Sequence, residues 1–168
     1  MAITINGNGT VSGITAGLTA AAMPTGSIIQ VSAQAYDYTS RTLTSTSYVK
    51  LTTDLDVTIT PTASNSKILL LGQVSFGMNY SDDSQGFAVF RDSTELKGIA
   101  VAAAESTNNN KVGMTGFSVL DAPGDTSAHT YSIFGKVASG YELYLNYAPG
   151  YGNLVTAGTS LIALEVAG

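Results

Sequence analysis

The sequence contains no cysteine and no tryptophan, one histidine, and few charged residues, which make up 11% of its 168 positions. Without cysteine there is no disulfide framework, no thiol nucleophile and no metal site with thiolate ligands. Soluble domains average roughly 25% charged residues, so this chain has less than half the usual share. Seven Lys plus Arg against twelve Asp plus Glu also exclude the basic surface of a nucleic-acid-binding protein.

Long apolar runs are absent as well. No segment reaches the roughly 18 apolar residues of a membrane span, and the first residues lack the positive charge and apolar run of a signal peptide. We therefore expect no membrane insertion and no secretory signal. Apolar residues still account for 44% of the chain, which is enough for one domain to bury a core.

What the sequence does contain is alternation of apolar and polar residues with a period of two. Leu55, Val57 and Ile59 alternate with Asp and Thr, and clusters of turn-forming residues separate this run from similar ones. The pattern predicts an all-β fold, an antiparallel jelly roll or β-sandwich of about ten strands. The expected strands cover residues 28–35, 46–51, 54–60, 67–77, 86–92, 95–103, 111–120, 129–137, 141–147 and 159–166.

The beginning of the chain differs from the rest, because residues 1–27 carry no charged side chain. We interpret residues 1–26 as an N-terminal attachment or assembly arm that could add a strand to a partner's sheet. Residues 27–168 would then form the head domain. A frayed tail or an edge strand of the same domain is the alternative. The apolar residues expected to make the attachment are Ile3, Ile5, Val11, Ile14 and Leu18.

Residues able to carry out catalysis are scarce. The chain has no Gly-x-Ser-x-Gly, and His129 is more readily explained as a partly exposed residue at a strand end than as part of a triad. Asp54 and Asp56 lie two apart and would repel on the solvent face of one strand. Asp82 and Asp83 indicate a solvated turn rather than a calcium site. We expect no catalytic residues, no metal, no cofactor and no enzymatic activity.

Tyrosines gather in the last third of the sequence. A tyrosine ring is apolar while its hydroxyl forms hydrogen bonds, so these residues suit interfaces and stacking on sugars. A place in the core or in a subunit interface is the structural alternative. The candidates for ligand contact are Tyr141, Tyr144, Tyr147 and Tyr151.

Several stretches resemble small modules found in tail fibres and other virion proteins of bacteriophages, especially marine and cyanobacterial phages. The resemblance spans nearly the whole chain. It is carried by Ile3–Thr15, Met23–Val31, Val57–Leu71, Phe90–Leu96, Leu120–Tyr131 and Ser160–Val166.

The expected strand layout, with an apolar last strand, also resembles the jelly roll of C1q and tumour necrosis factor. That fold assembles as a homotrimer with its last strand at the threefold interface. A β-sandwich monomer whose last strand is merely central is the alternative. The residues that this resemblance assigns to packing or to the trimer interface are Leu161, Ile162, Leu164 and Val166.

Together these features favour a virion structural protein at the virion surface. The first hypothesis is a short homotrimeric fibre or spike, anchored to other virion proteins of the capsid or tail by its arm and contacting host-surface carbohydrate. The second is a capsid decoration protein that stabilises the head. The third is a polysaccharide-degrading enzyme, in which Asp82, Asp83 and Glu142 would be the candidate carboxylates.

Overall fold

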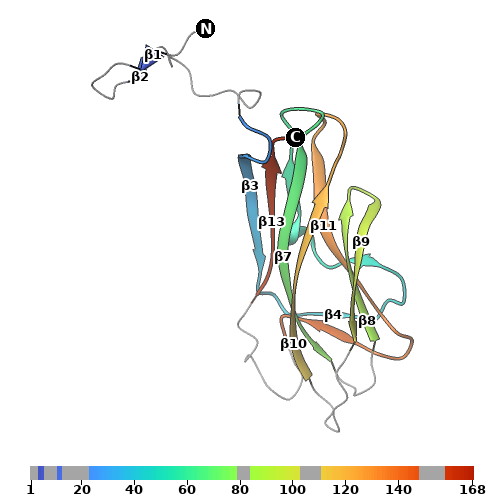
Figure 1. The fold of residues 1–168 in the computed structure, drawn as a ribbon. Helices are drawn as coiled ribbons and strands as arrows, with labels where there is room; N and C mark the ends of the chain where they lie inside the picture. Colours follow the sequence, from blue (N-terminus) through green and yellow to red (C-terminus); the bar gives the residue numbers. More distant parts are fainter. Residues whose placement is uncertain (1–3, 6–10, 13–22, 79–83, 103–110, 148–157) are drawn as a thin grey trace.

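The computed structural model describes residues 4–5, 11–12, 23–78, 84–102, 111–147 and 158–168. Two antiparallel sheets pack face to face (Figure 1), which confirms the predicted β-sandwich. In the described part of the chain the helical structure is limited to the 3₁₀ turn η2 (Thr53–Leu55). No described helix is long and apolar enough to cross a membrane.

The larger sheet has six strands, and β7 is its central strand. β10 pairs with β7 from Ile68 to Met78 on one edge. On the other edge β13 and then β12 pair with β7, and these two strands pair in turn with β3 and β4. The strands of this sheet are β3 (Ile28–Asp37), β4 (Arg41–Leu43), β7 (Lys67–Met78), β10 (Lys111–Asp121), β12 (Leu143–Leu145) and β13 (Thr159–Val166).

The smaller sheet has five strands, and β11 is its central strand. β8 pairs with one edge of β11, and β9 continues the sheet beyond β8. The short strands β5 and β6 share the other edge of β11. The strands of this sheet are β5 (Val49–Lys50), β6 (Val57–Ile59), β8 (Ser84–Arg91), β9 (Thr94–Ala102) and β11 (His129–Val137).

The core lies between the sheets, where the inward-facing residues of both meet. Phe76 of β7 contacts Phe87 of β8, with ring centroids 5.4 Å apart. The ring of Phe117 occupies the space beside Gly72, where an added Cβ would lie 2.3 Å from the ring. Such close packing explains why a small residue is required there. Fully buried members of the core include Leu55, Val57, Ile68, Leu70, Val74, Val89, Leu143 and Leu161.

Several details differ from the sequence prediction. The strands predicted over 46–51 and 141–147 are shorter, at Val49–Lys50 and Leu143–Leu145. β4 was not predicted, because three residues are too few to show alternation. The strand predicted over 54–60 begins only at Val57, because the Thr52 side chain accepts a hydrogen bond from the Asp54 amide and starts η2.

The N-terminal region contributes a separate two-stranded element. β1 (Thr4–Ile5) and β2 (Val11–Ser12) pair antiparallel with each other and with no other described strand. In Figure 1 this hairpin lies apart from the sandwich. The chain enters the sandwich at Gly26, whose amide donates to the Ala167 carbonyl at 2.8 Å and so joins the start of β3 to the end of β13.

Candidate functional site

Strand β13 lies inside the larger sheet, paired with β3 on one edge and β7 on the other. Its residues alternate between the two faces of the sheet. Leu161 is fully buried in the core, which corresponds to the packing role, one of the two roles expected for this residue. Ile162, Leu164 and Val166 lie on the opposite face and are half-buried.

The outward positions of the neighbouring strands continue this apolar surface. Leu164 lies beside Leu69 of β7 and Val31 of β3, and Leu69 lies opposite Leu120 of β10. Directly paired side chains in a sheet are close enough to contact one another. The nine residues form what we call the outer face: Ile28, Val31, Leu69, Leu71, Met114, Leu120, Ile162, Leu164 and Val166.

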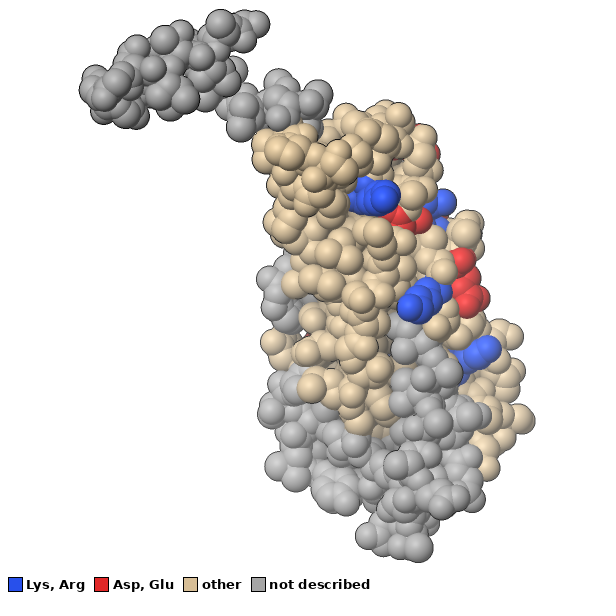
Figure 2. Space-filling model, viewed as in Figure 1, with Lys and Arg blue, Asp and Glu red and all other residues tan. Residues whose placement is uncertain are grey.

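The outer face is exposed and almost uncharged. Val31, Met114 and Leu120 are 64%, 60% and 58% exposed, and Ile28 is 55% exposed. Among the outward positions that the structure describes on these four strands, one side chain is charged. It is Lys67, the first residue of β7. In Figure 2 the part over β3 and β13 carries no coloured atoms, and the charged side chains gather toward β8 and β9.

An exposed apolar sheet face is unusual. One-sided antiparallel sheets normally place polar residues toward water, and contiguous apolar patches on monomers are rarely larger than a few hundred Å². The sequence predicted apolar residues on β13, but it gave no sign that β3, β7 and β10 would align theirs beside it. Only the strand order brings these residues together.

Asp54 and Asp56 do not share one face of a strand as expected, because Asp54 lies in η2 and β6 begins only at Val57. Each has its own cation: Arg41 lies 2.7 Å from Asp54, and Lys50 lies 2.8 Å from Asp56. The hydrogen bond from Arg41 lowers the pKa of Asp54. Such exposed pairs are each worth little.

His129 forms a link between two loops at one end of the sandwich. Its Nδ1 lies 2.9 Å from Asp92 Oδ2, and its Nε2 lies 3.1 Å from Asp125 Oδ1. The hydrogen bond to Asp92 is the main reason that the pKa of His129 is raised, with Asp125 adding to it. The pKa of Asp92 is lowered, chiefly by His129, and that of Asp125 is lowered, chiefly by the Ser127 amide.

A second polar network joins β8, β10 and β11. The Arg91 guanidinium donates to both carboxylate oxygens of Asp121, at 3.0 and 2.9 Å, and the buried Tyr131 hydroxyl donates to Asp121 at 2.7 Å. Burial raises the pKa of Tyr131. The network satisfies the polar groups that the sandwich buries here, so we assign it a structural role.

Glu165 is a fully buried carboxylate that the sequence did not reveal. Its Oε1 accepts from the amide and hydroxyl of Thr62, both at 2.7 Å, and its Oε2 accepts from Gln30 at 2.7 Å. Burial acts to raise its pKa, but the hydrogen bonds outweigh burial and the pKa is lowered. The charge is retained because it has donors.

The predicted tyrosine group is partly described. Tyr144 donates a hydrogen bond to Glu142 and packs edge-on against Tyr147, with ring centroids 5.9 Å apart. Tyr141 is half-buried, and Tyr151 lies outside the described residues. The structure therefore brings two of the four candidates together, on and just after β12.

The remaining predicted residues concern the arm and the carboxylates. Ile5 and Val11 are register partners in the β1–β2 hairpin. The other arm residues, Ile3, Ile14 and Leu18, lie outside the described residues, as do Asp82 and Asp83. Within the described ranges, no group of three His, Asp or Glu side chains is arranged to hold a metal ion.

No family model matches the chain, and no curated protein matches it. It is similar to a chain from the crystal structure of the T13 IBDV viral particle, with a TM-score of 0.42 and 10% identity over 82% of this chain. It is also similar to a chain from a structure of the infectious bursal disease virus Gx strain, with a TM-score of 0.41 and 13% identity over 83% of this chain.

This chain spans 35% and 37% of the length of those two chains. Similarities this weak carry no argument about fold or function. The fold assignment rests on the strand pairing, and the functional proposal rests on the outer face.

Proposed function

We propose that the chain is a virion structural protein that assembles through the outer face of its larger sheet into a short homotrimeric spike or fibre at the virion surface. The observation that carries this proposal is the outer face itself. Ile28, Val31, Met114 and Leu120 are each more than half exposed in the single chain. Covering these side chains would gain roughly 25 cal/mol per Å² of apolar area removed from water.

The chemistry of the outer face favours copies of the same chain as the covering partner. Among its described positions this surface has one cation, Lys67, at its end, which offers no charge pattern for a charged partner to recognise. Apolar surfaces of this kind are typical of homo-oligomer interfaces. The sequence resemblance to jelly rolls that trimerise through their last strand supports three copies rather than two, with Ile162, Leu164 and Val166 facing the axis.

The remaining parts of the chain take the other roles of such a subunit. Residues 1–26 attach it to neighbouring virion proteins, which a charge-free segment can do without desolvating charge. Tyr144 and Tyr147 present adjacent rings that could contact host-surface carbohydrate. Weak glycan contacts of this kind gain strength when a trimer presents three of them.

The second candidate is a capsid decoration protein, which the outer face and the arm fit equally well. The two roles differ in number and place. Quantitative mass spectrometry of purified particles should find a few dozen copies for a tail spike and hundreds for decoration of the head. Absence of the chain from particles would reject both roles.

We also propose that the chain has no catalytic function. The polysaccharide-degrading alternative is tested by incubating the purified protein with capsular or cell-wall polysaccharide and measuring chain length. The proposal expects intact polysaccharide. Shortened polysaccharide, with cleavage lost in Glu142→Gln, would establish the enzyme instead.

A further inference from the structure

The free edge of β10 is the least protected strand edge among the described residues. One edge of β10 pairs with β7 from Lys111 to Asp121, and no described strand pairs with the other edge. Residues 112–120 contain neither charge nor proline. Native proteins usually guard a free edge with charges, proline or a short strand, and β10 has none of these between its ends.

Other edges of the two sheets are guarded. β9 carries Glu95 and Lys97. The edge of β3 is closed against the smaller sheet, because the Gln30 side chain donates to the Thr60 carbonyl at 2.7 Å. β4, β5 and β6 have only two or three residues each. The β10 edge therefore stands out as a template for an added strand.

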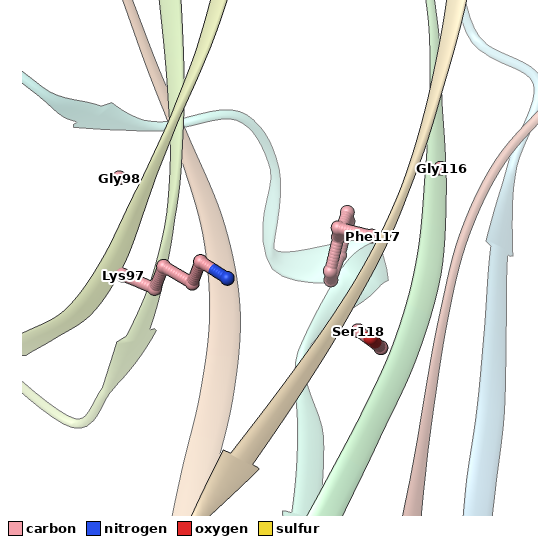
Figure 3. Close-up of a pocket in the computed structure, with 5 residues that line it drawn as sticks. All are labelled: Lys97, Gly98, Gly116, Phe117 and Ser118. Carbon is pink, nitrogen blue, oxygen red and sulfur yellow. The ribbon is translucent and has the colours of Figure 1, made fainter.

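A cleft along the β10 edge makes it accessible. The cleft has a volume of about 320 Å³ and lies between β9 and β10. Figure 3 shows Lys97 reaching from β9 toward β10, where Phe117 and Ser118 lie. A Cβ added at Gly116 would meet nothing closer than the Gly72 carbonyl oxygen at 3.9 Å, so no described side chain packs over Gly116 on that side of β10.

The β1–β2 hairpin, in turn, lacks a third strand. Each of its strands has two residues and pairs only with the other, and an isolated two-stranded hairpin is marginally stable at best. Its sequence surroundings, residues 1–27, are uncharged, so docking on the neutral β10 edge would desolvate no charge. Residues 13–27 could extend over roughly 50 Å, so this segment is long enough to leave its own sandwich.

We propose that the free edge of β10 receives the β1–β2 segment of a second copy of the chain as an added strand. This inference rests on the assembly role proposed for residues 1–26 and names the acceptor of that arm. Backbone N–H and C=O groups on the free edge of β10 supply the hydrogen bonds. In a closed ring of copies, each one donates one arm and accepts one arm.

Cross-linking tests the proposal, because the chain has no native cysteine. Full-length Thr4→Cys and full-length Ser118→Cys are mixed in equal amounts and treated with a flexible bismaleimide, which tolerates any strand register. The expected product is a heterodimer of twice 17.2 kDa. Its yield should exceed that of Thr4→Cys mixed with Ser139→Cys, an exposed turn position, by about five-fold or more. Equal yields would overturn the proposal.

A charge introduced on β10 provides a second test of the proposal. Gly116→Lys has room for its side chain and places a cation on the outward side of β10, beside its free edge. The mass of this variant is therefore also measured by sedimentation equilibrium, and it should equal that of the wild type. In the Ser118→Cys chain Gly116→Lys should lower the heterodimer yield about five-fold and leave Tm unchanged, whereas Ser139→Lys should leave both unchanged. An unchanged yield with Gly116→Lys would contradict the assignment.

Three further outcomes test separately the second copy, the β10 acceptor and the virion role. Cross-linking confined to single copies of a Thr4→Cys/Ser118→Cys double variant would overturn the assignment to a second copy. Incorporation of the chain into particles without cross-linking would reject only the β10 acceptor. Cross-linking by a chain that is absent from particles would support the acceptor while rejecting the virion role.

Discussion

The outer face of the larger sheet and the polar end of the smaller sheet meet their surroundings in opposite ways. On the outer face, apolar side chains from four strands lie in register, and Lys67 is the one charged side chain among the outward positions that the structure describes on these strands. At the polar end, His129 is held between Asp92 and Asp125. Because water stabilises the second arrangement and not the first, the comparison indicates which surface requires a partner.

Strand β13 contributes residues both to the core and to the outer face. Leu161 and Glu165 are fully buried inside the sandwich, while Leu164 lies on the outer face. Substitutions along this one strand can therefore separate effects on the stability of the subunit from effects on its assembly.

The largest effect is expected from Leu161→Asp. The change places an unpaired charge in the core, which should reduce the free energy of unfolding by ~4 kcal/mol or more. Circular dichroism and urea titration would show a largely unfolded chain. A folded variant with nearly unchanged stability would mean that Leu161 is not in the core.

Leu164→Asp should leave each subunit folded but abolish association. The carboxylate would be exposed to water in the single chain and buried against a neighbour in the assembly, so the dissociation constant should rise roughly 100-fold or more. Analytical ultracentrifugation measures the shift from trimer to monomer. Thr94→Asp, at an exposed position of β9, is the matched control and should remain trimeric.

Glu165→Gln should cost about 2 kcal/mol of unfolding free energy, because an amide cannot accept all the hydrogen bonds that the carboxylate accepts. Since the folded pKa of Glu165 is lowered, its contribution is present above the ordinary pKa and is lost as the pH falls through the folded value. Urea titrations at pH 7 and pH 3 should therefore show a smaller difference at pH 3. Glu95→Gln, which is exposed, should change little at either pH.

The smallest effect is expected at His129. Its raised pKa means that the protonated ring stabilises the fold below about pH 6.5, the unfolded value, and that this contribution is lost as the pH rises through the folded pKa. His129→Gln should therefore cost about 1 kcal/mol or less near pH 6 and less still at pH 9. The NMR ring resonance of this single histidine should titrate with a midpoint above pH 6.5. A midpoint below that pH would contradict the hydrogen bonds of His129 to Asp92 and Asp125.

Alternation of apolar and polar residues predicted most strands, because one face of such a strand is buried and the other faces water. The bounds of β11 and β13 agree with the predicted 129–137 and 159–166. β13 also shows where alternation fails, since both of its faces are apolar and the sequence could not separate Leu161 from Leu164. Glu165 was missed for a related reason: its donors, Thr62 and Gln30, come from distant parts of the chain.

The outer face itself could not be predicted from the sequence. Its residues belong to four strands whose order is β10, β7, β13 and β3, which is far from their order along the chain. Period-two patterns report which residues share a face of one strand, but not which strands lie side by side.

The mass of the wild-type protein in solution tests the central claim most directly. If the outer face joins three copies, sedimentation equilibrium at micromolar concentration should give three times 17.2 kDa, and Leu164→Asp should give one. A wild-type protein that remains monomeric at every concentration would contradict the account, because the outer face would then be a surface that tolerates water.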